Sequence, residues 1–434
     1  MLSAFMNAFR TPDLRRKLLF VLMIIVVFRA GSQIPAPGVH VSNVEACIKI
    51  AQEGSNAGLY SLVNMFSGGA LLQLTIFALG IMPYITASII LQLLVVVIPR
   101  LEALKKEGQA GQTKITQYTR YLTLGLAVLQ ATGIVALART GNLLQGCDRD
   151  LLHSNGTETF LVLVITMTAG TAVIMWLGEL ITERGVGNGM SILIFTQVVA
   201  TFPAGLWQVK ITQGWWTFGV VVAIGLAVVA GVIFIEQAQR RIPVQYARRM
   251  VGRKMFGGSS TYIPLKVNQA GIIPVIFASS LMYLPAMAVQ FNAEDPPQFV
   301  RFLNKYFVDQ ANPVHWAAYF LLIIFFTYFY VSITFNPEEV SDNMKKYGGF
   351  IPGIRAGKPT QDYLSYVLSR ITLPGSLYLG LISLIPLIAL ALINASQNFP
   401  FGGTSILIMV GVALDTVKQI ESQLQQRNYE GFLR

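Results

Sequence analysis

The sequence has few of the residues that build metal sites, disulfide frameworks and catalytic groups. Its 434 residues include only two cysteines and three scattered histidines, too few for a ligand cluster or a CxxC motif. It contains no Walker-type phosphate loop, no HExxH and no nucleophile elbow. The glycine-rich GVGNG at 185–189 precedes an apolar run instead of following a strand, so it predicts a tight turn. We therefore expect no metal, no cofactor and no enzymatic activity.

Charge is also scarce. Only 12% of the residues are charged, whereas soluble domains average about a quarter. Hydrophobic residues make up 53% and the mean hydropathy is +0.56, which indicates a polytopic membrane protein. None of the 21 acidic residues falls in the middle of an apolar run, since Glu179, Glu236 and Asp415 all lie within about a turn of a run's end. An ion-coupled carrier usually needs an ionisable group or unwound carbonyls near the midplane, so this class is disfavoured.

The long apolar runs predict an all-α fold of membrane-spanning helices. Ten runs are long enough to cross a bilayer, and an even number of crossings puts both termini on one side. Arg15-Arg16-Lys17 before the first run resembles the start of a signal peptide, but Arg29 interrupts that run and further spans follow, so we expect an uncleaved span. The predicted spans are 18–34, 76–98, 119–138, 159–179, 187–203, 216–235, 269–291, 315–335, 371–393 and 402–417.

The stretch from Leu59 to Pro99 predicts two elements, because as one helix it would measure about 60 Å across a hydrocarbon core of about 30 Å. Ser67-Gly68-Gly69 supplies the break, since these are weak helix formers. The second piece is long enough to span. The first, at about 59–74, is short and glycine-rich, so we expect a half-helix enclosed in a cavity. The alternative is an interfacial helix lying on the bilayer.

The basic residues between the spans predict the orientation. Lys and Arg number 25 on the side of the N-terminus and 6 on the opposite side, with Arg29 inside a span. Basic loops face the cytoplasm, so both termini are expected there. Two long loops on that side, at about 237–266 and 336–370, predict either a headgroup-binding surface or a docking platform. The first contains Arg240, Arg241, Arg248, Arg249, Arg253 and Lys254, a cluster that would attract phosphate backbone or an acidic protein surface. Interleaved Tyr246, Met250, Met255 and Phe256 suggest a partner that also makes apolar contacts.

Stretches across nearly every span resemble the SecY family of protein-conducting channels. The matching sequences are NMFSGGAL at 64–71, FALGIMPYITASII at 77–90, KKEGQAGQTKITQYTRY at 105–121, WLGELITERGVGNG at 176–189, QRRIPVQYARR at 239–249, PLKVNQAGIIPVIFASS at 264–280, GGFIPGIRAGKPT at 348–360 and FGGTS at 401–405. The resemblance implies two pseudo-symmetric halves, 1–205 and 206–434, hinged at the outer loop around 202–215, with an hourglass pore between them. It implies a plug below the constriction, formed by Asn64, Met65, Phe66, Ser67, Gly68 and Gly69.

The resemblance also implies a pore ring of Ile81, Ile85, Met190, Ile194, Ile276 and Ile408, with Met190 where related sequences commonly have isoleucine. Ile81 and Ile85, like Met190 and Ile194, are spaced i, i+4, so each pair can point one helix face at a shared axis. A narrow aliphatic collar dewets, which blocks ions while it yields to a bulky polypeptide. Taken singly, each isoleucine would more often face lipid or the helix core.

A lateral gate is implied between the second and third spans and the seventh and eighth. Its polar group would be Thr86, Gln130 and Asn268, which can hydrogen-bond across helices and be displaced; the alternative is ordinary contact between helices. Partners implied by the resemblance are the SecA motor ATPase or the ribosome with its rRNA, docking on the basic loops and at Arg355 of the IPGIR stretch. Small membrane subunits like SecE and SecG, membrane lipids and nascent or unfolded secretory chains complete the set.

The function expected is a passive channel in the plasma (inner) membrane that moves unfolded secretory chains outward and releases apolar segments sideways. A secondary transporter built on an inverted repeat and a scaffold without a pore are the alternatives. From the residues alone we expect a disulfide between Cys47 and Cys147, because both fall in outer loops, on the oxidising side. The bond requires that the two Cα atoms come within about 7 Å.

Overall fold

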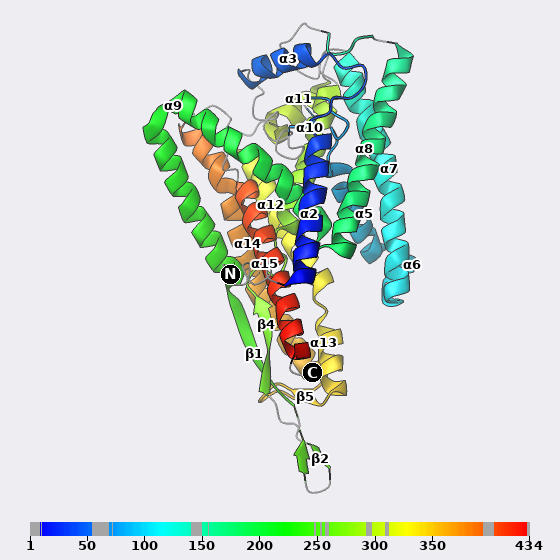
Figure 1. The fold of residues 1–434 in the computed structure, drawn as a ribbon. Helices are drawn as coiled ribbons and strands as arrows, with labels where there is room; N and C mark the ends of the chain where they lie inside the picture. Colours follow the sequence, from blue (N-terminus) through cyan, green and yellow to red (C-terminus); the bar gives the residue numbers. More distant parts are fainter. Residues whose placement is uncertain are drawn as a thin grey trace.

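A computed structural model describes the chain at residues 9, 11–53, 69–71, 73–139, 150–154, 156–246, 249–251, 254–256, 260–291, 297–308, 312–393 and 403–431. Helices dominate these residues, and most of the long ones run along one common direction (Figure 1). They are α2 Pro12–Gly31, α3 Val41–Glu53, α5 Met82–Val97, α6 Pro99–Lys106, α7 Gln109–Arg139, α8 Thr157–Arg184, α9 Gly189–Gln237, α10 Ile273–Phe291, α11 Gln298–Leu303, α12 Pro313–Thr334, α13 Pro337–Lys346, α14 Lys358–Ile393 and α15 Gly403–Gly431, with a short π-helical turn at Asn304–Val308.

Six of the described helical segments are long and apolar enough to cross a membrane, or seven if the bent pair α5 and α6 counts as one span. The two helices of this pair meet at 98°, because Pro99 opens α6 and holds the preceding Ile98 in an extended conformation. The prediction of an all-α, multi-pass membrane protein is confirmed. The ten predicted spans each overlap a described helix, and their full number stays a prediction.

Helix α9 joins the fifth and sixth predicted spans in one bent element. The bend is at Gly214, whose φ of 84° and ψ of 178° lie outside the range of L-residues. Beside it the Lys210 ammonium lies 3.9 Å from the ring centre of Trp207 and 4.1 Å from that of Trp215. This bend falls within 202–215, where the hinge between halves is predicted, and lies toward the end of the molecule that carries α3 (Figure 1).

A small sheet occupies the end of the molecule opposite α3, and we call this the sheet end. Strands β1 (Gln239–Tyr246), β4 (Ser260–Lys266) and β5 (Gly349–Phe350) pair in the order β4-β1-β5, all antiparallel. Beyond them β2 (Arg249–Val251) and β3 (Lys254–Phe256) form a separate hairpin that projects farthest from the helices (Figure 1). The two long basic loops predicted from the sequence are therefore joined by strand pairing into one structure, and no pattern in the sequence had indicated this pairing.

The three largest of the five buried hydrophobic clusters in the described part of the chain lie in different parts of the molecule. The outer cluster, at the α3 end, draws its members from residues 36–167. The sheet cluster, under β1 and β4, draws its members from residues 242–371. The collar cluster lies between them and takes side chains from α2, α5, α8, α9, α10, α12, α14 and α15. Only this middle cluster of the three combines the two predicted halves.

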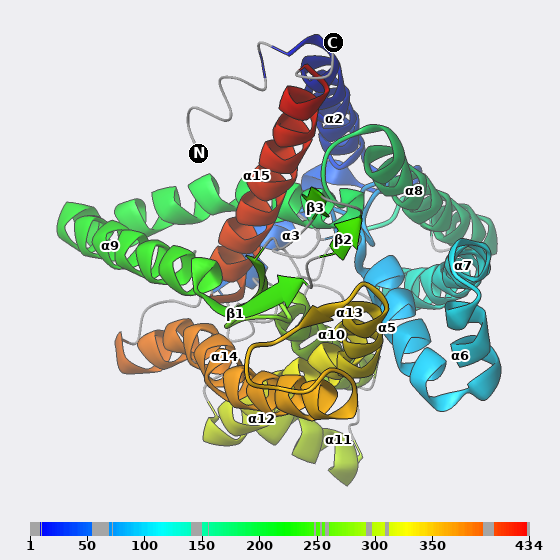
Figure 2. The ribbon, with the colours of Figure 1, turned by 90° about the horizontal axis from the view of Figure 1, so that it is seen from below.

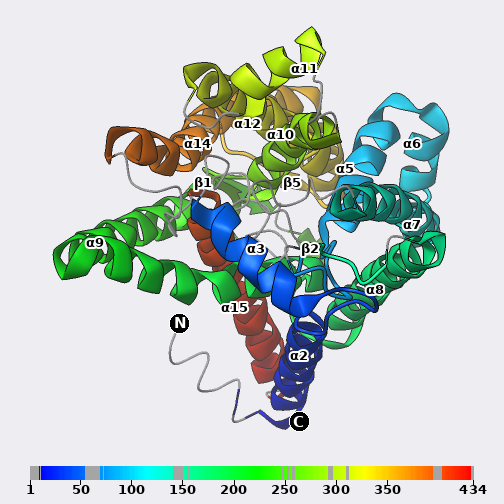
Figure 3. The same cartoon turned by 90° about the horizontal axis from the view of Figure 1, so that it is seen from above.

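The α3 end is closed by segments of the first half. Isolated antiparallel bridges join Pro35 to Thr75 and Val39 to Leu152. Helix α3 lies across the ends of the long helices in the view from above (Figure 3). At the sheet end, α15 runs toward α2, so that segments from the two ends of the chain come together (Figure 2). A small buried cluster at this end contains Leu14 of α2, Ile420 of α15 and Val186.

Candidate functional site

Residues 69–71 and 73–81, which include the end of the predicted half-helix at about 59–74, form turns with one isolated bridge residue at Thr75. Gly69 has a φ of 90°; the other predicted plug residues, Asn64, Met65, Phe66, Ser67 and Gly68, lie outside the described residues. Both the backbone N–H and the hydroxyl of Thr75 donate to the carbonyl of Ala70, at 3.1 and 3.2 Å. The turn is thus held by a buried threonine before the chain enters α5.

Two glycines allow this segment to lie tightly against neighbouring helices. A Cβ on Gly170 of α8 would come within 2.0 Å of the carbonyl oxygen of Ile76. A Cβ on Gly31 of α2 would come within 2.2 Å of the Phe77 ring, which also stacks on Phe28 at 5.9 Å. The close approach of α2 and α8 therefore fixes where α5 starts, and Ile81 is its N-cap residue.

Five of the six predicted ring residues are buried together in the collar cluster. They come from opposite parts of the chain and are between 1% and 7% exposed: Ile81 and Ile85 of α5, Ile194 of α9, Ile276 of α10 and Ile408 of α15. Because these five side chains are all aliphatic, they offer no hydrogen bond to water or to an ion. The arrangement fits a seal.

Met190, the sixth predicted ring residue, packs against the collar cluster and is partly buried. Its sulfur lies 2.5 Å from the position that a Cβ on Gly178 of α8 would take. Asn188 caps α9 just before it, with Oδ1 accepting from the N–H of Met190 at 3.0 Å. The thioether is therefore packed against the glycine of α8, within the first half.

Helix α10 provides the contact between the halves at the predicted gate, because it lies against both α5 and α7. The three predicted gate residues are not joined by any hydrogen bond of the described part of the chain. Thr86 is half-buried and its hydroxyl donates to Met82 of its own helix at 3.0 Å. Gln130 is half-buried on α7. Asn268 precedes α10 and donates to Glu236 and to the carbonyl of Gly271.

The predicted docking residues lie at the sheet end. Arg240 and Arg241 of β1 are exposed, and the Arg241 guanidinium lies 4.9 Å from the ring centre of Tyr262 on β4. The hairpin pairs Arg249 with Phe256 and Val251 with Lys254. Arg248 and Arg253 lie outside the described residues. The contact with the Tyr262 ring orders the aliphatic part of the Arg241 side chain and leaves its charged guanidinium at the surface.

Arg355 is exposed in the loop that follows β5. Gly353 and Gly357 on either side have φ values of 84° and 104°, so the loop turns sharply twice. The Thr360 hydroxyl donates to the Arg355 carbonyl at 2.9 Å and fixes the backbone beneath it. Because β5 pairs with the end of β1, this loop and the basic strand belong to the same end of one sheet.

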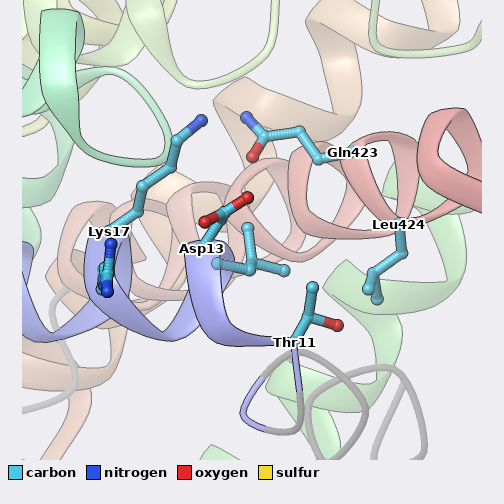
Figure 4. A pocket seen from close by; sticks show the side chains of 7 residues that line it. Thr11, Asp13, Lys17, Gln423 and Leu424 are labelled. Atoms are coloured by element: carbon cyan, nitrogen blue, oxygen red, sulfur yellow. The ribbon is translucent and has the colours of Figure 1, made fainter.

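A cavity of about 380 Å³ lies between the first turn of α2 and the last part of α15. Asp13 and Lys17 extend from α2 toward Gln423 of α15 (Figure 4). Thr11, Leu14, Arg16 and Leu424 complete the lining. None of the residues that line this cavity belongs to the collar cluster. The lining shows that the start of α2 and the last part of α15 lie side by side.

Cys47 lies in the outer cluster and is fully buried. Its sulfur is engaged in a disulfide. Leu151 and Leu152, which follow the predicted partner in sequence, belong to the same cluster. Cys147, the other cysteine of the chain, lies outside the described residues, and its pairing with Cys47 stays a prediction.

Comparison with known proteins gives a consistent family. The family model named SecY matches residues 75–417. A protein translocase subunit SecY of Streptomyces scabiei is 68% identical over 440 residues and one of Mycobacterium bovis 60% identical over 441 residues, each covering all of both chains. Among solved structures, a protein-conducting channel aligns with a TM-score of 0.63 at 18% identity, covering 94% of this chain and 91% of the other.

A second solved structure, Sec61 in the canine ribosome–channel complex from the endoplasmic reticulum, aligns with a TM-score of 0.60 at 17% identity and covers 94% of this chain and 91% of that one. At these identities the two structures establish the shared fold. The relatives that are 60% or more identical establish the family.

Proposed function

Since the chain belongs to the SecY family, we propose that it is the channel through which unfolded secretory proteins leave the cytoplasm and through which apolar segments pass sideways into the bilayer. It acts as a conduit and carries out no catalytic step of its own. Energy for transport is supplied by partners that bind the sheet end.

One observation carries this proposal: the collar cluster is the place where both halves of the chain meet, and its centre is aliphatic. Ile81, Ile194, Ile276 and Ile408 bring together four helices of both halves. Such a collar excludes water when it is empty, because a narrow apolar constriction dewets. A passing polypeptide separates the same side chains without having to break hydrogen bonds to them.

The plug and the gate follow from the same arrangement. The half-helix at about 59–74 blocks the pore on one side of the collar, and the tightly held segment from Gly69 to Ile81 fixes its end. Apolar segments leave between α5 and α7 on one side and α10 and α12 on the other. The contacts of α10 with α5 and α7 support this position for the gate.

The sheet end faces the cytoplasm in this proposal, and the membrane is the plasma membrane. The exposed guanidinium groups of Arg240, Arg241 and Arg355 support this orientation, because basic segments stay on the cytoplasmic side. The cavity between α2 and α15 supports a common side for both termini.

The partners proposed for the sheet end are the SecA motor and the ribosome, whose rRNA would meet the basic strands. A ribosome-bound relative supports the second of these, since canine Sec61 was solved in a ribosome–channel complex. Small membrane subunits of the SecE and SecG kind are proposed to lie against the helices. The arginines could bind phosphate groups or carboxylates, because a guanidinium forms paired hydrogen bonds with either group.

Planar-bilayer conductance with and without residues 60–70 tests the function. A plugged channel is silent at rest and conducts ions after the deletion. A transporter would show no conductance in either form and would accumulate solute. A scaffold would show neither behaviour, so silence of the deletion variant together with absence of protein export would overturn the proposal.

A further inference from the structure

A buried polar joint connects the sheet to the start of α10. Glu236 is the last residue but one of α9, and Asn268 lies between β4 and α10. Their side chains are 8% and 2% exposed. The Asn268 amide donates to the Glu236 carboxylate and, at 3.0 Å, to the carbonyl of Gly271. One amide group therefore ties the end of α9 to the turn that opens α10.

The β1–β4 ladder starts at the same place. Gln239 pairs with Lys266 in the first rung, and the Val267 N–H donates to the Ala238 carbonyl at 3.0 Å. Asn268 is the next residue along the chain. Backbone hydrogen bonds between β1 and β4 therefore continue up to the residue next to Asn268.

Two further helices enclose the joint. A Cβ on Gly375 of α14 would come within 2.4 Å of the Val267 carbonyl, and one on Gly411 of α15 within 2.6 Å of the Ile272 side chain. The Ile276 N–H, one turn into α10, bonds to the Ile272 carbonyl at 3.3 Å. Ile276, the predicted ring residue of α10, thus lies one helical turn beyond Ile272, which directly follows the Gly271 that Asn268 holds.

The joint has unused hydrogen-bonding capacity. Among the described residues, Asn268 Oδ1 and the Tyr378 hydroxyl of α14 are buried without a hydrogen-bond partner. Asn268 Oδ1 is therefore an acceptor within the pair itself that is available for a second arrangement.

We propose that the Glu236–Asn268 pair is the joint through which a partner bound to the sheet moves α10 and loosens the collar at Ile276. Asn268 acts here as a positioning residue, because it sets the place of Ile276 without touching the passing chain. Its amide is engaged at the root of the sheet and not across the gate. The proposal rests on the proposed function in one respect, namely that a partner drives transport from the sheet end.

Motor-driven export into proteoliposomes, measured against the concentration of purified SecA motor, tests the joint. Asn268→Ala and Glu236→Leu remove the hydrogen bond, whereas Glu236→Gln keeps an oxygen that accepts it. We expect the maximal rate to fall about tenfold in the first two and to stay within about twofold of wild type in the third. The motor concentration for half-maximal rate stays unchanged in all three, since Arg240, Arg241 and Arg355 remain.

A merely structural role would lower the rate of Glu236→Gln as much as that of Glu236→Leu, or would shift the half-maximal concentration, and either result overturns the proposal. Amide hydrogen exchange at Val275 and Ile276 gives a second measurement that needs no motor. It should accelerate in Asn268→Ala and Glu236→Leu but not in Glu236→Gln. Unchanged exchange in all three variants overturns the joint, whereas a wild type that never responds to SecA contradicts only the proposed driving partner.

Discussion

The outer cluster and the sheet cluster lie at opposite ends of the molecule, and each is built from one half of the chain. The outer cluster uses residues 36–167 and holds Cys47, whereas the sheet cluster uses residues 242–371 and supports an exposed basic surface. The collar cluster between them combines both halves. The outer cluster and the sheet cluster therefore each lie within one half, whereas the collar cluster and the small cluster of Leu14, Val186 and Ile420 join the two halves.

The largest effect is expected where the halves meet. Replacing Ile276 or Ile408 with Asn places a hydrogen-bonding group in the aliphatic collar, so water enters and the resting seal weakens. Resting ion leak should rise severalfold, and export of proteins with poor signal sequences should improve. Planar-bilayer recording and an export assay measure the two quantities.

Ile276→Leu is the matched control, because it conserves volume and polarity. It should keep the leak at the wild-type level. If the Asn variants also keep the wild-type leak, the assignment of these residues to the ring is wrong. The collar cluster would then not differ from the two end clusters in sealing the channel.

A second effect is expected at the sheet end alone. Arg355→Lys keeps the charge but removes the paired hydrogen bonds that a guanidinium makes to a carboxylate. Motor-driven export should fall about tenfold, as expected for one lost charge-assisted contact, with no change in resting leak. Lys358→Arg, also exposed nearby, serves as the control and should have no effect. Unchanged export in Arg355→Lys would favour simple headgroup binding.

The outer cluster should respond in stability and not in transport. Cys47→Ser puts a hydroxyl in a fully buried apolar site and removes the predicted bond to Cys147, so the thermal midpoint in detergent should fall by a few degrees. Motor affinity at the sheet end should stay the same. Non-reducing mass spectrometry of protein purified without thiols checks the bond. Detection of two free, alkylatable cysteines would contradict the predicted pairing.

The smallest effect is expected on α6, outside all three clusters. Lys106 contacts Glu102 at 2.7 Å and lowers the pKa of the Glu102 carboxyl by its hydrogen bond, but both side chains are largely exposed. Exposed ion pairs contribute little to stability. Glu102→Gln should therefore leave the thermal midpoint, the leak and export at wild-type values. A clear loss of export in this variant would show that partners also contact α6, outside the sheet end.

The spans were predictable because apolar runs of this length have few alternatives in a bilayer. The strands at the sheet end were harder to predict, since the basic residues dominated the interpretation of that loop. The sequence did carry a signal for β1. Arg241, Ile242, Pro243 and Val244 are alternately exposed and buried, which is the period-two pattern of a half-buried strand.

Side-chain partners were beyond the sequence. Glu236 lies near the end of α9, but its contact with Asn268 joins residues 32 positions apart and depends on the ladder between them. The packing of Met190 on Gly178 likewise depends on how closely α8 and α9 approach. Spacing along one helix gives the face on which a side chain lies, and only the assembled helices decide which neighbour it meets.

The make-up of the collar cluster has a consequence for the order of synthesis. Ile81 is made early, whereas Ile408 belongs to α15, the last described helix of the chain. The outer cluster is complete once residue 167 has been made, so the first half can settle while translation continues. The collar has to wait for α15. A newly made chain therefore cannot complete the collar cluster until α15 has been synthesised and has packed against the earlier helices.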